Sequence, residues 1–348
     1  MLSEKSVKEI REHLDNCENP VFFYDSDADG LASFVLLAKY IGKGKGIVVK
    51  NFREQLEMYL SKIRHLGADY VFVLDKPQLT QEFIDGVNEM NLPLIVIDHH
   101  DVPKLDNLEF YYNTFYESGK NESVAELCYS ITQQKKDMWV AAVGAVADVR
   151  MPGFFKEFEK ENPELVDCKY EEAFDIRYKC KLGKLIDIFN FGLKNTTTNV
   201  VKFQKFLIDA QFPSEVLEEN AKTKVLLEKY NQINEIIDKL VIKAEKKIDH
   251  EKKFLWFTYG GGMSVSQHFA DKLMYKNPGV VLVIGYTQEK AMVKFSFRGK
   301  PQNVQKLVLN SIKGLEGAKG GGHKHSSGAI VPSDKVEEFK DKVIANLE

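Results

Sequence analysis

The sequence predicts an α/β protein built from two units, and three observations lead to this prediction. Short apolar runs alternate with helix-like segments over the first 100 residues. Residues 214–248 are strongly charged and contain no Gly or Pro. After residue 250, strand-like and helix-like segments return. We therefore expect an N-terminal domain (1–213) with a parallel, doubly wound sheet, a linker helix (214–250) and a smaller α/β domain with a mixed sheet (251–348).

The N-terminal strands are predicted from runs rich in aromatic and β-branched residues. Near-continuous apolar runs of this length suit strands that are buried on both faces. The four predicted strands are Pro20–Tyr24, Gly46–Val49, Tyr70–Leu74 and Pro93–Ile97. The helices expected between and after them are Leu31–Ile41, Gln55–Leu66 and Thr80–Met90. Thr80 is a good N-cap residue for the last of these.

The rest of the chain is predicted to be mainly helical up to residue 248. Helices are expected at Ser123–Gln133 and Met138–Ala147, with several more between Phe154 and Ala210. Apolar residues recur at helical spacing in Ser214–Ile248, which predicts one helix or a pair of helices. In the second domain the expected strands are Phe254–Tyr259, Val280–Tyr286, Ala291–Phe297 and Ala329–Val331, and the expected helices are Ser264–Tyr275, Asn303–Lys313 and Asp334–Leu347.

The charge of the chain is nearly balanced overall but unevenly distributed. Its 348 residues include 48 basic and 51 acidic ones, a net charge of −3, which excludes a histone-like binder of polyanions. From Glu251 onward there are 15 basic and 9 acidic residues, a balance of +6, which leaves −9 for the first 250 residues. An acidic part is thus joined to a basic part, although chance variation of the surface is an equally good explanation of charge alone.

The four cysteines and the N-terminal segment predict the compartment. Cys17, Cys128, Cys168 and Cys180 show no Cys-x-x-Cys spacing. The first 16 residues are charged and amphipathic, unlike a signal peptide, and no apolar run approaches about 18 residues. We therefore expect a cytoplasmic protein with reduced thiols and no association with a membrane.

Three carboxylates follow the first predicted strand directly. Asp25, Asp27 and Asp29 alternate along the chain before Gly30, a spacing that lets acids converge on a hard cation. An EF-hand loop is disfavoured because a strand precedes it and Leu36 stands where the bidentate Glu belongs. Asp29 is alternatively the N-cap of a helix that begins near Gly30.

Further acids and two histidines follow other strands. Asp75 ends the third strand, and Asp98-His99-His100 ends the fourth. Ligands in open α/β sheets bind outside the carboxyl ends of the strands, so these side chains are expected at one edge. Mixed Asp and His ligands suit Mn²⁺, and more than four of them suggest two metal ions. Asp148 follows the apolar stretch 140–147 and means little by itself.

A glycine-rich segment near the C-terminus is a candidate phosphate or carboxylate cradle. It runs from Gly320 to Gly328 and includes His323, Lys324 and His325. Glycines let backbone N–H groups approach a ligand closely, although a mobile surface loop is the plain alternative. Ser296 and Arg298 end a predicted strand upstream, and Arg298 is either a bidentate phosphate ligand or a surface residue near a hairpin.

Together these motifs resemble the DHH phosphoesterase superfamily over nearly the whole chain. Asp98-His99-His100 is the triplet that names the family, and residues 25–30, Asp75 and residues 144–148 resemble its other motifs. Residues 320–328 resemble the signature of the associated C-terminal domain. The resemblance implies a bilobal enzyme with a two-Mn²⁺ centre in which Mg²⁺ is an alternative cation.

The resemblance also assigns roles to individual residues. It implies that Asp75 bridges the two ions, that Asp98 orients a histidine, and that His100 faces the substrate phosphate. The implied metal ligands are Asp25, Asp27, Asp75, His99 and Asp148; the implied catalytic residues are Asp29, Asp98 and His100; and the implied substrate-binding residues are Ser296, Arg298, Gly320, Gly321, Gly322, His323 and His325. Many relatives carry a His two or four residues before the first Asp, where this chain has Phe23 and Val21.

The form of the first motif looks closer to RecJ-like exonucleases than to inorganic pyrophosphatases. The implied activity is Mn²⁺-dependent hydrolysis of single-stranded DNA, RNA or short oligonucleotides from an end. An alternative is a phosphatase or phosphodiesterase for small nucleotides, such as a 3′,5′-bisphosphate or a cyclic dinucleotide. A non-catalytic scaffold of a replication complex is less favoured, because the matched acids and His99 are all present. A homodimer and a replication or repair protein are the partners considered.

Overall fold

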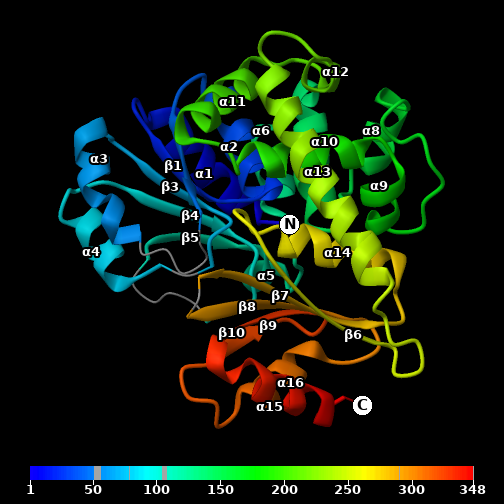
Figure 1. Cartoon of the computed structure of the whole chain (residues 1–348). Helices are drawn as coiled ribbons and strands as arrows, with labels where there is room; N and C mark the ends of the chain where they lie inside the picture. The colour runs from blue at the N-terminus through cyan, green and yellow to red at the C-terminus, as the bar shows by residue number, and fades with distance from the viewer. Residues whose placement is uncertain (51–55, 78, 104–107, 290, 348) are drawn as a thin grey trace. The chain divides into compact units, whose positions relative to one another are not determined.

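The computed structural model describes residues 1–50, 56–77, 79–103, 108–289 and 291–347. The chain folds as two compact units, Met1–Tyr230 and Asn231–Glu348 (Figure 1). The helix α13 (Lys224–Glu245) begins in the first unit and ends in the second. It follows the short helix α12 (Pro213–Leu217), so the segment predicted as a linker contains two helices of very different length. The predicted boundaries at 213 and 250 stay predictions.

The first unit contains a parallel sheet of five strands. The strands are β1 (Val21–Asp25), β2 (Lys45–Val49), β3 (Val71–Leu74), β4 (Leu94–Asp98) and β5 (Phe110–Asn113), in the spatial order β2-β1-β3-β4-β5. Every neighbouring pair is parallel, as predicted. The strand β5 is an addition to the four that the apolar runs predicted. Of the predicted helix Gln55–Leu66, Gln55 lies outside the described residues.

Helices cover both faces of this sheet, which confirms the doubly wound fold. One face packs Phe22, Phe72 and Leu74 against α2 (Ala28–Ile41), and the other packs Val21, Phe23 and Val73 against Ile63 and Phe83. Those two residues belong to α3 (Leu60–Leu66) and α4 (Gln81–Asn88), which lie together on one side of the sheet in Figure 1. The α2 helix is buried along most of its length because α6, α7 and α11 pack around it.

The remaining helices of the first unit surround this core. They are α1 (Glu4–Asn16), α5 (Thr114–Ser118), α6 (Val124–Thr132), α7 (Met138–Ala147), α8 (Phe155–Glu161), α9 (Ala173–Lys179), α10 (Leu182–Gly192) and α11 (Thr197–Asp209), with the 3₁₀ turns η1 (Leu56–Tyr59) and η2 (Lys135–Asp137). Among all the described residues of the chain, no helix is both long and apolar enough to cross a bilayer.

The second unit contains a mixed sheet, as predicted, with five strands where four were expected. The strands are β6 (Phe254–Gly260), β7 (Val281–Glu289), β8 (Met292–Arg298), β9 (Lys319–Gly322) and β10 (Ser326–Pro332), in the order β6-β7-β8-β10-β9. Only the pair β6–β7 is parallel. The helices are α14 (Ser266–Lys276), α15 (Val304–Ile312) and α16 (Val336–Ala345), with the 3₁₀ turn η3 (Ser333–Lys335).

The helices of the second unit leave part of its sheet uncovered. Phe295, Phe297 and Ala329 point toward Val308 and Phe339, so one face of β8 and β10 packs on α15 and α16. On the other face, α14 packs against β7 and β8. Strand β10 and the edge strand β9 therefore keep one face outside both helical layers.

Two of the four cysteines correct the expectation of reduced thiols. Cys168 and Cys180 form a disulfide, with their Cα atoms 5.1 Å apart, whereas Cys17 and Cys128 are free and buried. Cys180 stands at the end of α9, and the chain before that helix folds back so that Cys168 meets it. A separation of 12 residues gives no local signal for this pairing.

Candidate metal centre

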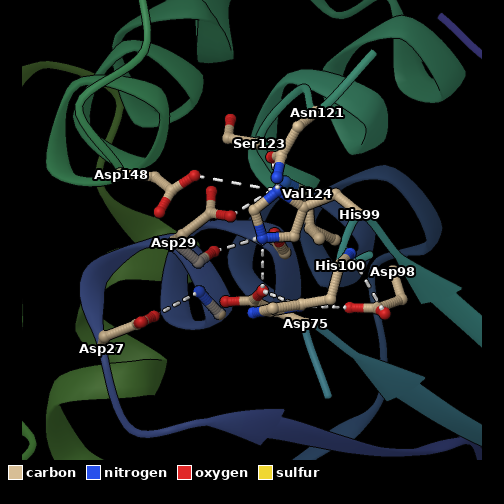
Figure 2. Close-up of polar contacts among 12 residues, drawn as sticks. Asp27, Asp29, Asp75, Asp98, His99, His100, Asn121, Ser123, Val124 and Asp148 are labelled. Carbon is tan, nitrogen blue, oxygen red and sulfur yellow. Dashed lines mark hydrogen bonds and ion pairs between the residues drawn. The ribbon is translucent and has the colours of Figure 1, made fainter. Parts of the chain in front are cut away.

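The acids and histidines predicted at strand ends come together at one edge of the first sheet. Asp25 and Asp98 are the last residues of β1 and β4, and Asp75 directly follows β3. These three strands are neighbours and run in the same direction, so their carboxyl ends meet. Asp148 arrives from the end of α7. Figure 2 shows Asp29, Asp75 and Asp148 grouped around His99.

Asp75 lies at the middle of this group and is 3% exposed. Its Oδ1 atom is 3.2 Å from His99 Nε2 and 3.9 Å from His100 Nδ1. Among the described residues, none donates a hydrogen bond to this buried Oδ1 atom. The backbone of Asp75 has φ +58°, a left-handed conformation that Asp and Asn adopt more readily than most residues. A buried carboxylate oxygen without a donor is what a cation ligand requires.

The two histidines are held by hydrogen bonds to their Nδ1 atoms. His99 Nδ1 lies 2.6 Å from Asn121 Oδ1, and His100 Nδ1 lies 2.8 Å from Asp98 Oδ1. Because the partner oxygens are acceptors, each Nδ1 carries the proton. The lone pair of each ring is then on Nε2, which is the usual arrangement for a metal-ligating histidine with an outer hydrogen-bond partner. Asp98 is fully buried and also accepts from Asn113 Nδ2 at 3.3 Å.

Asp29 has a different structural role from the predicted helix cap. The N-cap of α2 is Asp27, whose Oδ1 accepts from Gly30 N at 2.9 Å. The Asp29 carboxylate instead accepts from Val124 N (2.8 Å) and Ala125 N (2.9 Å). It therefore caps α6, about 95 residues further along the chain, and fixes that helix beside the strand edge. The expectation that Asp29 is the N-cap of α2 was therefore wrong.

Two groups of side chains have ligand atoms close enough to share a cation. The first is Asp75, His99 and His100, and the second is Asp29, His99 and Asp148, with all ligand atoms of a group within 4.8 Å of one another. Three predicted ligands, Asp75, His99 and Asp148, belong to these groups. Asp25 and Asp27 do not, whereas Asp29 and His100, predicted in other roles, do. The chemistry of this donor set fits divalent cations, whose number and identity stay predictions.

The electrostatics of the site also fit a cation. Burial and the neighbouring charge of Asp27 raise the pKa of Asp25 to about 7. Burial and the charge of Asp29 raise the pKa of Asp27 to about 6, and burial and Asp148 raise that of Asp29 to about 6. The pKa of Asp75 is raised well above its usual value by burial and the charges of the surrounding acids. Mutual repulsion among buried carboxylates is relieved when a cation joins them.

Three asparagines support the site, and the sequence motifs did not identify them. Asn121 holds His99, and Asn113 donates to both Asp98 and the carbonyl oxygen of His100 (3.0 Å). Asn190 Oδ1 accepts from Ala28 N at 3.0 Å and fixes the start of α2. Asn113 ends β5, Asn190 lies in α10 and Asn121 lies in a loop, so they share no motif or spacing. The sequence therefore offered no reason to choose these three among the other asparagines.

The predicted glycine loop of the second unit is a β-strand. Gly320, Gly321 and Gly322 belong to β9 and pair with Ala329, Gly328 and Ser327 of β10. His323, Lys324 and His325 form the hairpin turn, where His325 Nδ1 lies 3.0 Å from the carbonyl oxygen of Gly299. The segment is therefore a β-hairpin and not a mobile surface loop, and its contact with a phosphate or carboxylate stays a prediction.

The three glycines of β9 differ in what a side chain at their position would meet. A Cβ on Gly320 would lie 2.5 Å from Val308 Cγ1, and Gly322 has φ +136° with Ser327 Cα only 2.6 Å from its virtual Cβ. At Gly321 a Cβ would meet nothing within 4 Å. Gly321 lies beside Gly328, which lies beside Ser296 on β8. These three residues therefore form a row with almost no side chains across the uncovered face of the sheet.

Arg298 is buried rather than exposed near the hairpin. Its Nε donates to Asp271 Oδ1 at 2.5 Å, and its Nη1 donates to the carbonyl oxygen of Phe297 at 3.0 Å. Asp271 belongs to α14, so this pair ties the helix to the end of β8. A bidentate contact of Arg298 with phosphate would have to compete with this pair.

Comparisons with known proteins agree with this arrangement. Residues 21–151 match the model of the DHH family N-terminal domain, and residues 252–348 match that of the DHHA1 domain. The chain therefore belongs to the DHH superfamily, whose members are metal-dependent phosphoesterases, and its fold is RecJ-like. This confirms the resemblance found in the sequence. Among curated proteins, no sequence matches the chain.

Three solved structures illustrate the similarity. RecJ from Thermus thermophilus in complex with Mn²⁺ has a TM-score of 0.70 at 15% identity, covering 98% of this chain and 54% of that chain. An exonuclease RecJ bound to manganese has a TM-score of 0.67 at 16% identity, covering 99% and 94%. PggH, a pGpG-specific phosphodiesterase from Vibrio cholerae, has a TM-score of 0.54 at 12% identity, covering 95% and 99%. The chain thus spans about half of the Thermus protein.

Proposed function

We propose that this protein is a Mn²⁺-dependent phosphodiesterase that removes nucleotides from an end of single-stranded nucleic acid or short oligonucleotides. The observation that carries the proposal is the convergence of Asp29, Asp75, Asp148, His99 and His100 at one sheet edge. The similarity of the fold to RecJ exonucleases supports the nucleic-acid substrate. Mn²⁺ is favoured over Mg²⁺ because imidazole nitrogen joins the carboxylates in both groups.

The chain's own residues would hold the cations and position the substrate. Asp75 would help to hold a cation at one candidate position, and Asp29 and Asp148 would do so at the other. His99 belongs to both groups and would give its one Nε2 lone pair to one of them. Divalent cations held there would stabilise negative charge on the phosphoryl group and lower the pKa of water. Asn121 keeps the Nε2 lone pair of His99 directed at Asp75. In its predicted role His100, held by Asp98, faces the substrate phosphate.

The second unit offers a surface for the nucleic-acid backbone. Ser296, Gly328 and Gly321 lie side by side, and the exposed lysines Lys294 and Lys319 lie on the same face of their strands. A ligand can approach the backbone of β9 closely because Gly321 leaves open space. The basic balance after residue 250 adds a general attraction for phosphate.

One digestion experiment tests the proposal directly. Single-stranded DNA and RNA of 2, 5, 10 and 20 nucleotides, labelled at either end, are incubated with the protein and Mn²⁺, Mg²⁺ or EDTA. We expect release of mononucleotides from one end with Mn²⁺, weaker release with Mg²⁺ and none with EDTA. Internal cleavage products, or hydrolysis that EDTA does not suppress, would contradict the proposal.

A second candidate substrate is a dinucleotide. The similarity to the pGpG-specific phosphodiesterase PggH supports it, because that protein matches nearly the whole chain, as an exonuclease RecJ also does. The Thermus RecJ, in contrast, is almost twice as long as the part that this chain matches. Turnover of pGpG with no release from the 10- and 20-nucleotide substrates would select this candidate over the exonuclease. Cytoplasmic location, a homodimer and a replication or repair partner stay predictions.

A further inference from the structure

A cavity lies within the first unit, and none of the residues of the metal centre line it. It has a volume of about 380 Å³ and lies between α11 and the first turns of α13, next to the end of α10. Volumes of about 300–1,000 Å³ are typical of sites for small ligands. Nothing in the proposed phosphodiesterase reaction uses this cavity.

The floor of the cavity is apolar. Phe203, Phe206 and Leu226 line it, and Val225 at its edge is 49% exposed. Gly192 also lines it, and a Cβ there would lie 2.4 Å from the ring of Phe203. The absence of a side chain at Gly192 thus lets this ring pack close to the end of α10. Phe203 and Phe206 are three residues apart on α11, so their rings lie on one side of that helix.

Three exposed lysines surround this apolar floor, and none of them forms an ion pair with a described acid. Lys202, Lys205 and Lys222 line the cavity, and in the described part of the chain none of their ammonium groups has an ion pair. Some other surface lysines of the same unit are paired; for example, Lys135 contacts both Glu157 and Glu161 at 2.8 Å. Desolvated or clustered unpaired ammonium groups favour binding of an anion.

Polar groups with hydrogen-bonding capacity complete the lining. Asn195 and Asn199 line the cavity, and Asn199 Nδ2 donates to Asn195 Oδ1 at 3.0 Å. Within the described ranges, the Asn195 Nδ2 group and the Asn199 Oδ1 atom have no hydrogen-bond partner. Asp209, also in the lining, is the one acid of the cavity and makes no ion pair with any described residue. Donors, acceptors and a carboxylate therefore accompany the lysines.

From this lining we propose that the cavity binds a mononucleotide, either free or as one residue of a single strand. A base stacks on the ring of Phe206, and carboxamides such as Asn195 and Asn199 recognise base edges. Asp209 accepts from ribose hydroxyls, and the lysines neutralise the phosphate. A fatty acid would match the floor and the lysines but would make no use of the two amides and Asp209, so a nucleotide matches more of the lining. The proposal does not depend on metal binding or on catalysis.

Calorimetric titration of the full-length protein with AMP tests this proposal. The titration is done at low salt in EDTA, so that a cation-dependent site does not contribute. We expect saturable binding, equal in the Asp75→Asn variant, and at least about tenfold weaker in Lys202→Glu/Lys205→Glu. Phe206→Ala should weaken binding about tenfold through lost stacking. The matched control is Lys5→Glu/Lys8→Glu on α1, which makes the same charge change on two exposed side chains and should bind AMP like the parent.

Competitors define the ligand. If a decamer of deoxyadenylate displaces AMP, and its affinity is also lower in Lys202→Glu/Lys205→Glu, a residue of the strand enters the cavity. If the decamer does not displace AMP, the ligand is the free nucleotide. Both outcomes support the proposal. Inorganic phosphate binding as tightly as AMP, decanoate binding where AMP does not, or AMP affinity unchanged in Lys202→Glu/Lys205→Glu would each overturn it. Circular dichroism of every variant checks that the fold is retained.

Discussion

The two sheets of this molecule present their functional groups in opposite ways. The parallel sheet of the first unit collects carboxylates and imidazoles at the edge where its strands end. The mixed sheet of the second unit offers a face whose central row, Ser296–Gly328–Gly321, has almost no side chains. In the first, chemistry depends on which atoms the side chains bring; in the second, on how closely a ligand can approach the backbone. A substitution in the first sheet should therefore reduce activity by removing a ligand atom, and one in the second sheet by blocking access to the backbone.

The largest effect is expected for Asp75→Asn. Asn keeps the shape and tolerates the left-handed backbone at this position, but it removes a negative charge from one candidate cation position. We expect hydrolysis of a labelled oligonucleotide to fall about a thousandfold, with an unchanged circular dichroism spectrum. Asp85→Asn, an exposed acid of the same unit, is the control and should be fully active. Near-normal activity of Asp75→Asn would remove this residue from the centre.

A smaller loss is expected for Asn121→Ala, which touches the centre only through His99. Without its partner, the imidazole is free to rotate and the direction of its Nε2 lone pair is no longer fixed. Loss of such an outer partner typically costs about 10–100-fold in metal affinity or activity. Calorimetric titration with Mn²⁺ separates this role from a structural one, because the apparent Kd for Mn²⁺ should rise while the melting temperature without metal stays the same. Unchanged Mn²⁺ affinity would refute the positioning role.

The glycine row is tested by a matched pair of variants, Gly320→Leu and Gly321→Leu. At Gly320 the new side chain meets Val308, so we expect a loss of about 1–3 kcal/mol in the free energy of unfolding. At Gly321 the side chain has open space, so stability should be retained while KM for an oligonucleotide rises about tenfold. Denaturant unfolding and steady-state kinetics measure the two effects. Equal KM values for Gly321→Leu and the parent would show that substrate does not use this face.

The smallest effect is expected for the pH dependence of stability in the protein without metal. The folded-state pKa values of Asp25, Asp27 and Asp29 are raised, to about 7, 6 and 6, above the value of 3.8 expected when unfolded. The folded state therefore binds more protons between these values, and stability increases as pH falls from about 8 to about 5. Scanning calorimetry in EDTA should show a rising melting temperature, and a smaller rise in Asp75→Asn. Mn²⁺ should stabilise most at the higher pH, where its ligands are deprotonated.

The strands that were predicted well from the sequence are those whose burial leaves a clear apolar pattern. Strands β1, β3 and β4 are buried on both faces, so their apolar runs are nearly continuous. Strand β5 was missed because it is an edge strand with two half-exposed residues and only two buried ones. Strand β9 was missed because glycine disfavours strands; pairing with β10 and close packing of Gly320 on Val308 hold it in place instead.

The site was predictable to the extent that strand topology determines it. Asp75, Asp98, His99 and His100 could be placed at one edge because parallel strands end together. The capping of α6 by Asp29 could not be predicted, because it joins residues about 95 positions apart that no sequence motif links. The same holds for Asn121 and for the disulfide between Cys168 and Cys180, whose partners meet only after the helices have packed.

Asp29 has both a structural role and a place in a candidate cation group, which affects how this fold can change in evolution. One carboxylate anchors α6 through two backbone N–H groups and also belongs to a candidate cation group. Losing it would weaken helix packing together with metal binding, whereas Asp75 and His99 can change with less harm to the fold. In a descendant that has abandoned hydrolysis and kept only a binding role, Asp75 or His99 should therefore disappear first. Asp29 would persist there as a record of the ancestral enzyme.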